Sequence, residues 1–349
     1  MDKPLVSVNI LIYDSRAHIE RCLDSILAQS YPALEINLVI NGNADHALEL
    51  VQDKYGRHKN FNILEPGENL WFSRGHNYAL KHSRGDYVLV LNDDTIMDRE
   101  FIRTLVEALE TDKSLGSVSG KLLHYDYSID SRTKILDSTG IEMYKTRKVI
   151  DRGQWEKDRH QYDDDTEIFG ASGAAALYRR SALEEVKLPK PDLPAGRQAA
   201  TEYEYFDEDF VAYKEDVDLA WRLQLAGFRC RYIPAAIIYH GRSVGRSWPT
   251  QFIKFILNRH KQSRLVRKLS FKNHYLMMIK NEVFEAFFRD IVYFVTREIL
   301  LLGYTALFEP FQIMAVRDLV RQLPETRRKR KLVMQKVKIS NQQIAALFH

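Results

Sequence analysis

The chain has 349 residues, of which 45% are hydrophobic, and this is enough for more than one typical domain with a buried core. Its formal net charge is +4 at pH 7, so the overall charge does not mark the protein as one that binds nucleic acid. The two cysteines, Cys22 and Cys230, cannot form a disulfide framework, and each lies in an apolar stretch that is typical of a small core residue.

The N-terminal sequence leads directly into a predicted strand, without the apolar segment of a secretory signal. No uncharged apolar run reaches the roughly 18 residues that a membrane-spanning helix needs. We therefore expect a cytoplasmic protein without a membrane-spanning helix.

Strands and helices are predicted to alternate over residues 1–95. Residues 5–13 are apolar nearly throughout, which is typical of a strand that is buried on both faces. Asp14 and Ser15 form a plausible N-cap for a helix in which apolar residues recur at helical spacing. The next predicted elements are a strand at 36–40, a helix at 47–55, a strand at 61–64, a helix at 76–82 and a strand at 87–91. This order predicts a doubly wound α/β sheet whose first half binds a nucleotide.

The strand at 87–91 ends in Asn92, Asp93 and Asp94. In sheets of this kind, ligands bind outside the carboxyl ends of the strands. Because side chains alternate along a strand, Asn92 and Asp94 are expected on one side and Asp93 on the other. An amide oxygen beside a carboxylate suits Mg²⁺ or Mn²⁺ carrying a diphosphate. The alternative is an acidic turn before the helix predicted at 101–109.

The chain contains neither of the common glycine-rich phosphate-binding loops, GxGxxG or GxxxxGK[ST]. A nucleotide diphosphate would therefore have to be held in another way, and a metal ion on Asp94 is the candidate.

The middle of the chain is polar from about 121 to 168, and Asp163, Asp164 and Asp165 are expected in a solvated loop. Residues 168–178, with the sequence IFGASGAAALY, are rich in small side chains, which indicates close backbone approach to a ligand or to a packed element. A short helix is predicted at 182–186, and the Pro- and Gly-containing loop at 189–201 is expected to be mobile.

A second group of carboxylates lies between Asp207 and Asp218, interleaved with aromatic residues. Acidic residues in the first turn of a helix complement its dipole, which is one explanation of Glu215 and Asp216. Crowded, partly buried carboxylates are also how a general base with a raised pKa is made. The strand predicted at 228–239 is followed by His240, either as a metal ligand or as an ordinary edge residue.

These motifs together resemble the inverting nucleotide-sugar glycosyltransferases of family two, which have the GT-A fold. The match is best to a rhamnosyltransferase-like bacterial branch. The resemblance rests on residues 5–45 and 68–95, the latter ending in VLNDDT, on FGASGAAALYRR, and on residues 206–241 with YKEDVDLAWR and IIYHG. The resemblance covers about two thirds of the chain, in the order and spacing of the family.

The resemblance implies a function for individual residues. Asp94 corresponds to the metal-binding residue of the DXD-like motif, and His240 to a further metal ligand. Asp216, preceded by Glu215, corresponds to the general base that deprotonates the acceptor. The remaining implied residues are Tyr13, Asn41, Arg74, Asn92, Asp93, Trp221 and Arg222 on the donor side, and Gly170, Ala171 and Gly173 on the acceptor side. The implied cofactor is Mg²⁺ or Mn²⁺, and the implied reaction is a single displacement with inversion.

One position departs from the family. The second strand of family members commonly ends in an Asp that reads the pyrimidine ring, and here that position is Ile40. The nucleotide, UDP or dTDP, therefore stays open, as does the sugar, rhamnose or a hexose. Ile40 also motivates an alternative function, a catalytically silent sugar-nucleotide-binding partner in a polysaccharide assembly complex.

The last third of the chain, residues 242–349, is predicted to be a helical extension of a glycosyltransferase domain at 1–241. Residues 241–281 contain no Asp or Glu, and their Lys and Arg residues alternate with bulky apolar ones. Residues 283–308 are more apolar, and 327–331 form a basic cluster. We expect peripheral attachment to the inner face of the cell membrane, with a lipid-linked or growing cell-surface glycan as acceptor. A homodimer contact, a nucleic-acid groove and an ordinary helical subdomain are the alternatives, of which nucleic acid is the least favoured.

Overall fold

The computed structural model describes residues 3–42, 46–190, 202–241, 259 and 262–349. The mobile loop expected at 189–201 lies almost wholly outside the described residues. The N-terminal half contains β1 Val6–Ile12, α1 Ile19–Leu27, β2 Leu34–Ile40, α2 Ala47–Tyr55, β3 Phe61–Leu64, α3 Trp71–His82, β4 Tyr87–Asn92, β5 Thr95–Met97 and α4 Phe101–Thr111.

The central part of the chain adds most of the remaining strands and two helices. These elements are β6 Leu115–Asp126, β7 Ser131–Ser138, β8 Ile141–Met143, β9 Val149–Asp151, β10 Glu167–Ile168, β11 Ala175–Arg179, α5 Arg180–Val186, β12 Leu188–Pro189, β13 Tyr203–Glu204, the 3₁₀ helix η1 Glu208–Phe210, α6 Glu215–Leu225 and β14 Arg229–His240. The C-terminal elements are α8 Arg264–Asn281, α9 Phe284–Phe308, η2 Pro310–Gln312, α10 Ile313–Gln335 and α11 Asn341–Ala346.

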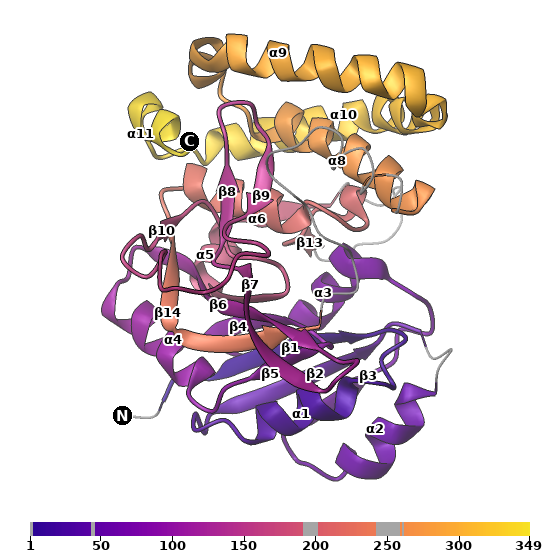
Figure 1. Cartoon of the computed structure of the whole chain (residues 1–349), viewed down its shortest axis with the longest axis vertical. Coiled ribbons are helices and arrows are strands. Elements are labelled where there is room, and N and C mark those ends of the chain that lie inside the picture. The colour runs from indigo at the N-terminus through magenta and orange to yellow at the C-terminus, as the bar shows by residue number, and fades with distance from the viewer. Residues whose placement is uncertain (1–2, 43–45, 191–201, 242–258, 260–261) are drawn as a thin grey trace.

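The described residues form a ten-stranded sheet with the order β10-β14-β6-β11-β4-β1-β2-β3, to which β5 adds beside β14 and β7 beside β6. The strands β3, β2, β1 and β4 are parallel, while β11 runs antiparallel to both β4 and β6. The doubly wound sheet predicted for the first half is therefore confirmed, and a mixed half follows it. Helices cover both faces, as Figure 1 shows.

Strand β4 has apolar side chains on both faces, and helices pack against each face. Its residues Tyr87, Leu89 and Leu91 belong to the core cluster that includes α1, α2 and α4. The alternate residues Val88 and Val90 belong to the cluster that includes α3, α5 and α6. A continuous apolar run is thus buried on both faces, as its sequence predicted.

The polar region at 121–168 contains strands that the sequence did not predict. Strand β7 pairs with the long β6, and β8 pairs with β9. The first five residues of β7 are exposed or half-buried, and β8 and β9 have three residues each. Strands β8 and β9 are too short, and β7 is too exposed, to contain the apolar run from which a strand was predicted elsewhere in the chain.

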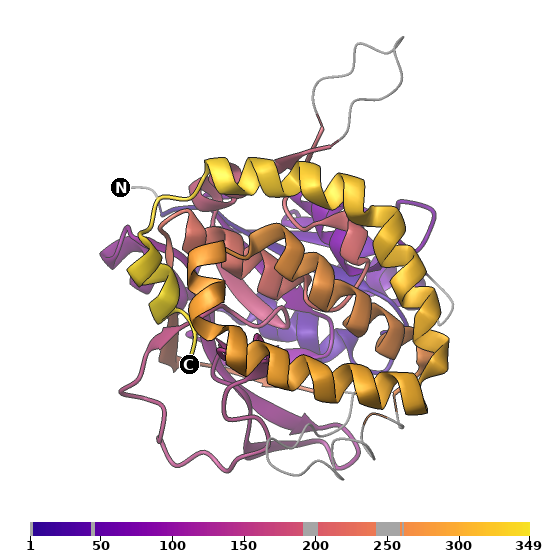
Figure 2. The same ribbon diagram turned by 90° about the horizontal axis from the view of Figure 1, so that it is seen from above.

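The C-terminal helices form a layer of their own over α6, with α9 outermost (Figures 1 and 2). They share a core with the sheet domain, because Trp221 of α6, Met277 of α8 and Phe348 near the C-terminus belong to one buried cluster. The extension predicted from residue 242 onward is therefore packed onto the sheet domain and is not an independent unit.

The expected lipid-facing role of the basic residues at 241–281 is wrong for three residues of α8. Arg267, Lys272 and Lys280 of α8 are buried, and their charged groups bind acidic residues or carbonyl groups of the protein itself. The residues Arg242, Arg246, Lys254 and Lys261 lie outside the described residues.

Candidate active site

Three of the predicted metal-site residues lie together at the carboxyl end of β4. His240 closes β14, which pairs with β5 just after Asp94. The His240 Nε2 atom lies 3.2 Å from Oδ1 of Asp94 and 3.3 Å from Nδ2 of Asn92. The backbone N–H of Gly241 donates to the carbonyl of Asp94 (2.9 Å), which fixes the two segments against each other.

A fourth residue, Asp137 at the end of β7, was not predicted from the sequence. It is almost fully buried, and its Oδ2 lies 2.7 Å from Nδ1 of His240. A carboxylate on one ring nitrogen sets the tautomer and directs the other nitrogen, here Nε2, toward the site. Burial opposes a charge on the ring, but Asp94 and Asp137 outweigh it and raise the pKa of His240 to about 10. The site is therefore one that favours positive charge.

The ligand types and the spacing of these residues suit a divalent ion. The imidazole nitrogen of His240 and the carboxylate of Asp94 are ligands that Mn²⁺ accepts, and the carboxylate also suits Mg²⁺, whereas the Asn92 atom beside His240 is its Nδ2, which is not a metal ligand. Two adjacent ligands of an octahedral ion with bonds of about 2.1 Å are roughly 3 Å apart. The 3.2 Å between Nε2 of His240 and Oδ1 of Asp94 agrees with that spacing. The donor set fits the ion that the sequence implied.

Asp93 points away from this cluster, as the alternation predicted. Its carboxylate accepts a hydrogen bond from the hydroxyl of Ser15 and lies 3.6 Å from Nε2 of His18. Ser15 also accepts from the N–H of Tyr13 (2.9 Å). The expected N-cap at Asp14 and Ser15 is wrong, because α1 begins only at Ile19 and the Ser15 side chain instead ties the end of β1 to Asp93.

The second acidic centre is Asp216 in the first turn of α6. Its Oδ2 accepts from the backbone N–H of Gly173 (3.0 Å), and its Oδ1 accepts from the N–H of Val217 (2.8 Å). Burial raises the pKa of Asp216 above its usual value, although these two hydrogen bonds act in the opposite direction. A half-buried carboxylate with a raised pKa is a suitable proton acceptor.

Glu215 has a different environment from its neighbour. It is buried, and its Oε2 has no hydrogen-bond partner among the described residues. Burial, together with the charges of Asp216 and Asp218, raises the pKa of Glu215 well above its usual value. The two neighbouring acids therefore differ in their contacts: two backbone N–H groups donate to Asp216, whereas Oε2 of Glu215 has no donor among the described residues.

The small-residue segment connects the two centres. The N–H of Asn92 donates to the carbonyl of Ala174 (2.9 Å), and the next residue back, Gly173, donates to Asp216. A Cβ atom on Gly173 would lie 3.2 Å from Oδ2 of Asp216. A Cβ at this position would crowd the Asp216 carboxylate, and the two acidic centres meet at one end of the sheet.

The other small residues have a packing role. A Cβ on Gly170 would lie 2.4 Å from the Cβ of Ala220, so Gly170 lets α6 approach the sheet. Ala171 is buried in the core cluster around α6. The structure does not bring these two residues to the acidic centres.

On the donor side, the end of β2 is fixed by Asn41. Its Oδ1 accepts from the N–H of Leu70 (2.6 Å), and its Nδ2 donates to the carbonyl of Trp71 (3.4 Å). The exposed ring of Tyr13 lies against Gly42, where a Cβ would be 3.0 Å from the ring. These contacts leave the Tyr13 ring facing solvent beside the ends of β1 and β2.

Three further predicted donor-side residues are engaged elsewhere. Arg74 pairs at the surface with Glu68 (2.9 Å). Trp221 is fully buried, with its ring against Phe169 and Phe348.

Arg222 is also buried. Its guanidinium donates to Asp218 (3.0 Å) and to the carbonyls of Val186 and Tyr205. The structure therefore gives Trp221 and Arg222 structural roles and does not bring them to the two acidic centres.

One other acidic group among the described residues has ligand-like spacing, namely Asp158, His160 and Asp163. The ammonium group of Lys121 lies 3.2 Å from Asp158 and 2.9 Å from Asp163. A cation of the protein is thus already paired with this cluster, and Asp163 is half-buried in that pair, whereas the sequence predicted a solvated loop.

Comparison with known proteins identifies the family. Residues 7–187 match the family described as Glycosyl transferase family 2. The chain belongs to this family. The poly-beta-1,6-N-acetyl-D-glucosamine synthase of Staphylococcus aureus is 27% identical over 232 residues, which are 65% of this chain and 47% of that protein. The synthase of Staphylococcus epidermidis is 23% identical over 239 residues, 67% of this chain and 49% of that protein. The chain thus spans about half the length of these relatives.

Solved structures confirm that this family 2 chain has the GT-A fold. The TarS 1-349 fragment of S. aureus in complex with UDP-GlcNAc has a TM-score of 0.54 and 15% identity, covering 99% of this chain and 89% of that chain. The mannosyltransferase PcManGT of Pyrobaculum calidifontis, in complex with GDP-Man and Mn²⁺, has a TM-score of 0.52 and 17% identity, covering 96% and 86%. These comparisons leave the rhamnosyltransferase-like branch untested, so it stays a prediction.

Proposed function

We propose that the protein is a metal-dependent inverting glycosyltransferase. It moves a rhamnosyl or hexosyl group from a nucleoside-diphosphate donor to a lipid-linked or growing cell-surface polysaccharide. One observation carries the proposal: a cluster of Asn92, Asp94 and His240 lies at the same end of the sheet as Asp216, joined to it through residues 173 and 174. Family membership supports the reaction class.

The two acidic centres suit the two halves of one displacement. Asp216 accepts the proton of the acceptor hydroxyl, whose oxygen forms a bond to the anomeric carbon of the sugar. The bond from that carbon to the diphosphate breaks, and the nucleoside diphosphate leaves with the bonding electrons. Since attack and departure occur on opposite faces, the anomeric configuration inverts.

The leaving group requires positive charge, which a bound Mg²⁺ or Mn²⁺ supplies. Asp94 and His240 would hold the ion, and Asn92 lies within reach of the same place. Asp137 keeps the Nε2 atom of His240 directed toward the ion through its 2.7 Å contact with Nδ1.

Recognition of the base differs from the family pattern. Ile40 has no hydrogen-bonding side chain, and both ends of the Asn41 amide are already engaged with the Leu70–Trp71 backbone. The exposed ring of Tyr13 is the side chain best suited to stack on the base. Stacking is tolerant of base identity, so UDP- and dTDP-sugars both belong in the test.

The first experiment measures nucleoside diphosphate released from a panel of UDP- and dTDP-sugars with Mn²⁺ or Mg²⁺. Slow hydrolysis of the true donor needs no acceptor. We expect turnover of one donor that is abolished by a chelator and by Asp94→Ala. No turnover, together with no metal-dependent nucleotide binding by calorimetry, would refute the proposal.

The alternative, a silent sugar-nucleotide-binding partner, predicts binding without turnover. The Asp216→Asn variant separates the two functions, because it removes the base and leaves the metal cluster unchanged. For the enzyme, this variant loses turnover and keeps donor affinity. For the silent partner, the wild-type chain and the variant bind alike and neither turns over the donor.

We also propose that the protein attaches to the inner face of the cell membrane through α9. By length and composition α9 could cross a membrane, which corrects the expectation that no helix reaches that threshold, and only 17% of its most apolar window is buried. Its ionisable residues Asp290 and Glu298 are buried and bound to Arg147 and Tyr275. A spanning helix would break these contacts, so α9 is proposed to lie in the plane of the interface.

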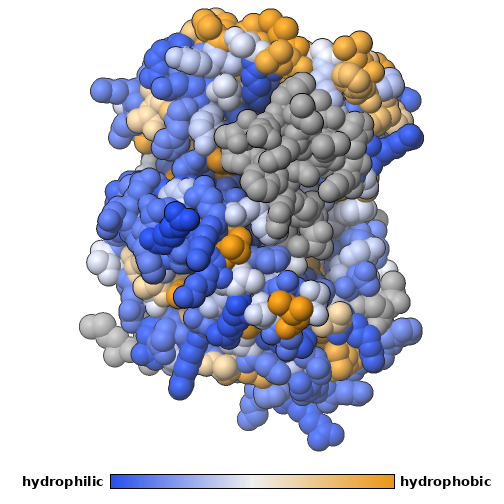
Figure 3. Space-filling model, in the orientation of Figure 1, coloured by the Kyte–Doolittle hydropathy of each residue, from blue (hydrophilic) through white to orange (hydrophobic). Residues whose placement is uncertain are grey.

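The exposed side of α9 is apolar and continues onto α10, and Figure 3 shows apolar residues gathered at that end of the molecule. Its exposed large apolar side chains are Phe284, Phe288, Val292, Tyr293, Val295, Ile299, Leu300, Leu302, Leu307, Phe308, Ile313, Met314, Val316 and Val320. Arg289, Arg317 and Arg321 are exposed on the same two helices, as is one acidic residue, Glu285. An apolar surface with basic residues beside it is suited to anionic lipid. In a dimer through the same surface, the basic residues of the two copies would repel each other.

Co-sedimentation with vesicles tests the attachment. We expect binding to vesicles containing anionic lipid, and its loss in a Phe288→Asp, Leu307→Asp double variant, whose side chains are 63% and 77% exposed. Ile129→Asp is the control, since Ile129 is 72% exposed on the β6–β7 turn, away from α9. Concentration-dependent dimerisation without vesicle binding, abolished by the same double variant, would replace the membrane with a second copy.

A further inference from the structure

The backbone just before Asp216 adopts conformations that L residues rarely take. The φ angles of Val211, Tyr213 and Lys214 are 66°, 71° and 71°. Val211 combines its positive φ with a ψ of −65°, the geometry of a tight γ-turn, which is rare and strained, and most of all for a β-branched residue. Such a segment persists only when its surroundings hold it in place.

A single side chain of the C-terminal extension holds this segment. The two N–H groups of Asn273 Nδ2, on α8, are shared among the carbonyls of Phe210 (2.9 Å), Ala212 (2.8 Å) and Tyr213 (2.7 Å). Asn273 is fully buried, and its Oδ1 has no hydrogen-bond partner among the described residues. The three carbonyls therefore determine the orientation of this amide, because a flipped side chain would place Oδ1 against three carbonyl oxygens and repel them.

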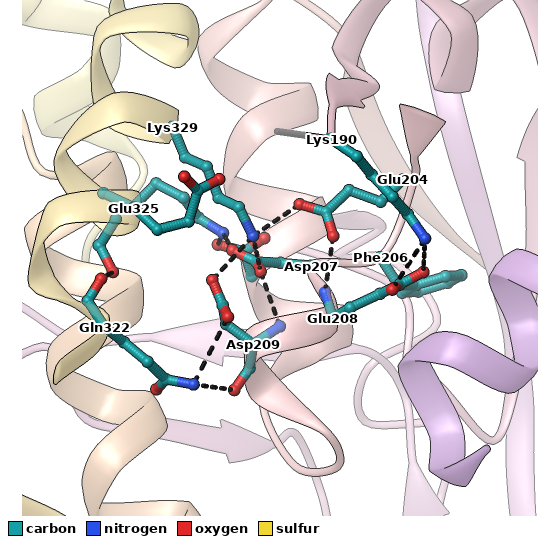
Figure 4. A network of polar contacts seen from close by, with 12 residues as sticks. Lys190, Glu204, Phe206, Asp207, Glu208, Asp209, Gln322, Glu325 and Lys329 are labelled. Atoms are coloured by element: carbon teal, nitrogen blue, oxygen red, sulfur yellow. Dashed lines mark hydrogen bonds and ion pairs between the residues drawn. The ribbon is translucent and has the colours of Figure 1, made fainter. Parts of the chain in front are cut away.

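The same C-terminal helices also anchor both flanks of the strained segment. Lys280 of α8 pairs with Asp207 before the segment and with Asp218 after it (2.9 Å). Lys329 of α10 pairs with Asp207 (2.5 Å) and Asp209 (2.9 Å), and Figure 4 shows its side chain pointing from α10 into this acidic group. With the flanks fixed by ion pairs, the turn between them is held by Asn273, which binds three of its carbonyls, and by the N–H of Ser73, which donates to the carbonyl of Val211 (3.2 Å).

We infer that Asn273 is a positioning residue for the reaction: it holds residues 210–213 in the strained turn that places Asp216 against the N–H of Gly173. This inference rests on the proposed role of Asp216 as the base. It also makes the C-terminal extension part of the active site, because the turn leading into α6 is shaped by α8. Asn273 itself need not touch substrate.

The test compares three variants of the full chain. Asn273→Ala removes the donor, and Asn273→Asp keeps the shape of the side chain but replaces the donating amide with a carboxylate that cannot donate. Leu276→Ala is the matched control, because Leu276 lies on the same helix, is equally buried, and packs in the core without touching residues 210–213 by hydrogen bonds. Thermal midpoints are measured first, and kinetics are then compared at equal distance below each midpoint.

Two readouts distinguish positioning from general stability. The first is the kcat of donor turnover beside the Kd of the nucleoside diphosphate with Mn²⁺. We expect both Asn273 variants to lower kcat on the order of 10–100-fold with little change in Kd, since small misplacements of a reacting group have effects of that size. Leu276→Ala should keep kcat.

The second readout is hydrogen exchange, which does not require activity. Replacing Asn273 should speed hydrogen exchange in the peptide covering 208–217 and at the amide of Gly173, which donates to Asp216. If both Asn273 variants match Leu276→Ala in kcat and in exchange, the inference is overturned. If the wild-type chain has no turnover, the proposed function fails, and the exchange comparison still decides whether Asn273 holds the turn.

Discussion

Replacing Asp137 by asparagine should weaken metal binding without removing any metal ligand. In the structure, the buried Asp137 carboxylate lies 2.7 Å from Nδ1 of His240 and directs the opposite nitrogen toward Asp94. Asparagine is of equal size, but it carries no charge. Its NH2 group can also donate to Nδ1 of His240, which would place the ring proton on Nε2, the nitrogen that faces Asp94. Changes to such outer partners typically cost 10–100-fold in metal affinity, which is about 1.4–2.7 kcal/mol.

The assay is a calorimetric titration of Mn²⁺ into the full chain at saturating UDP, for the wild type and Asp137→Asn. Asp163→Asn is the control, because it removes a carboxylate from the acidic group that Lys121 already neutralises. We expect Asp137→Asn to lose at least tenfold in affinity and Asp163→Asn to lose none. An affinity of Asp137→Asn within about twofold of the wild type, or a loss confined to Asp163→Asn, would refute the assignment of the site.

Three further predictions concern the base and the C-terminal layer. Burial raises the pKa of Asp216, and a general base must be unprotonated to act. Turnover should therefore fall as the pH drops through a value above about 4, the usual pKa of an aspartate. If kcat falls only at or below that usual value, Asp216 is not the base. Gly173→Ala places a Cβ 3.2 Å from the Asp216 carboxylate and should lower kcat on the order of tenfold or more with the Kd for nucleotide unchanged; an unaltered kcat would show that the contact is not needed. Arg147→Met removes the side-chain partner of the buried Glu282 carboxylate and leaves Asp290 with Arg289 alone (3.3 Å), and it should cost about 3–5 kcal/mol in denaturant unfolding. A loss below about 1 kcal/mol would mean that the pairs do not hold the helices.

The parts of the fold that followed from the sequence are those specified by local pattern. The helix at 47–55 and the strand at 61–64 have the predicted bounds, and the run at 87–91 is buried on both faces. Asp94 and His240 lie side by side, because both stand at the carboxyl ends of strands and such ends meet at one edge of a sheet; their role as metal ligands stays a prediction.

What the sequence could not predict depends on partners that are distant along the chain. Asp137 is 103 residues from His240, and it lies on a strand whose polar, partly exposed face shows no apolar run. Lys280 was interpreted as lipid-facing because basic and apolar residues alternate around it. Its partners, Asp207 and Asp218, are more than 60 residues away, and only the packing of α8 on α6 shows that its charge is internal.

The burial of Trp221 and Arg222 has the same explanation. Both residues lie in the second half of α6, and only contacts with distant parts of the chain show that they face the core: Arg222 binds the carbonyls of Val186 and Tyr205. Here Phe348, near the end of the chain, covers Trp221.

The most direct test of the account is a single donor assay on three proteins: the wild type, Asp94→Ala and Asp216→Asn, each with Mn²⁺ and with a chelator. The account predicts turnover by the wild type with Mn²⁺ alone, loss of both turnover and metal-dependent nucleotide binding in Asp94→Ala, and loss of turnover with binding retained in Asp216→Asn. Turnover that survives the chelator, or that persists in Asp216→Asn, would contradict the pairing of a metal centre with a separate base on which the proposed mechanism rests.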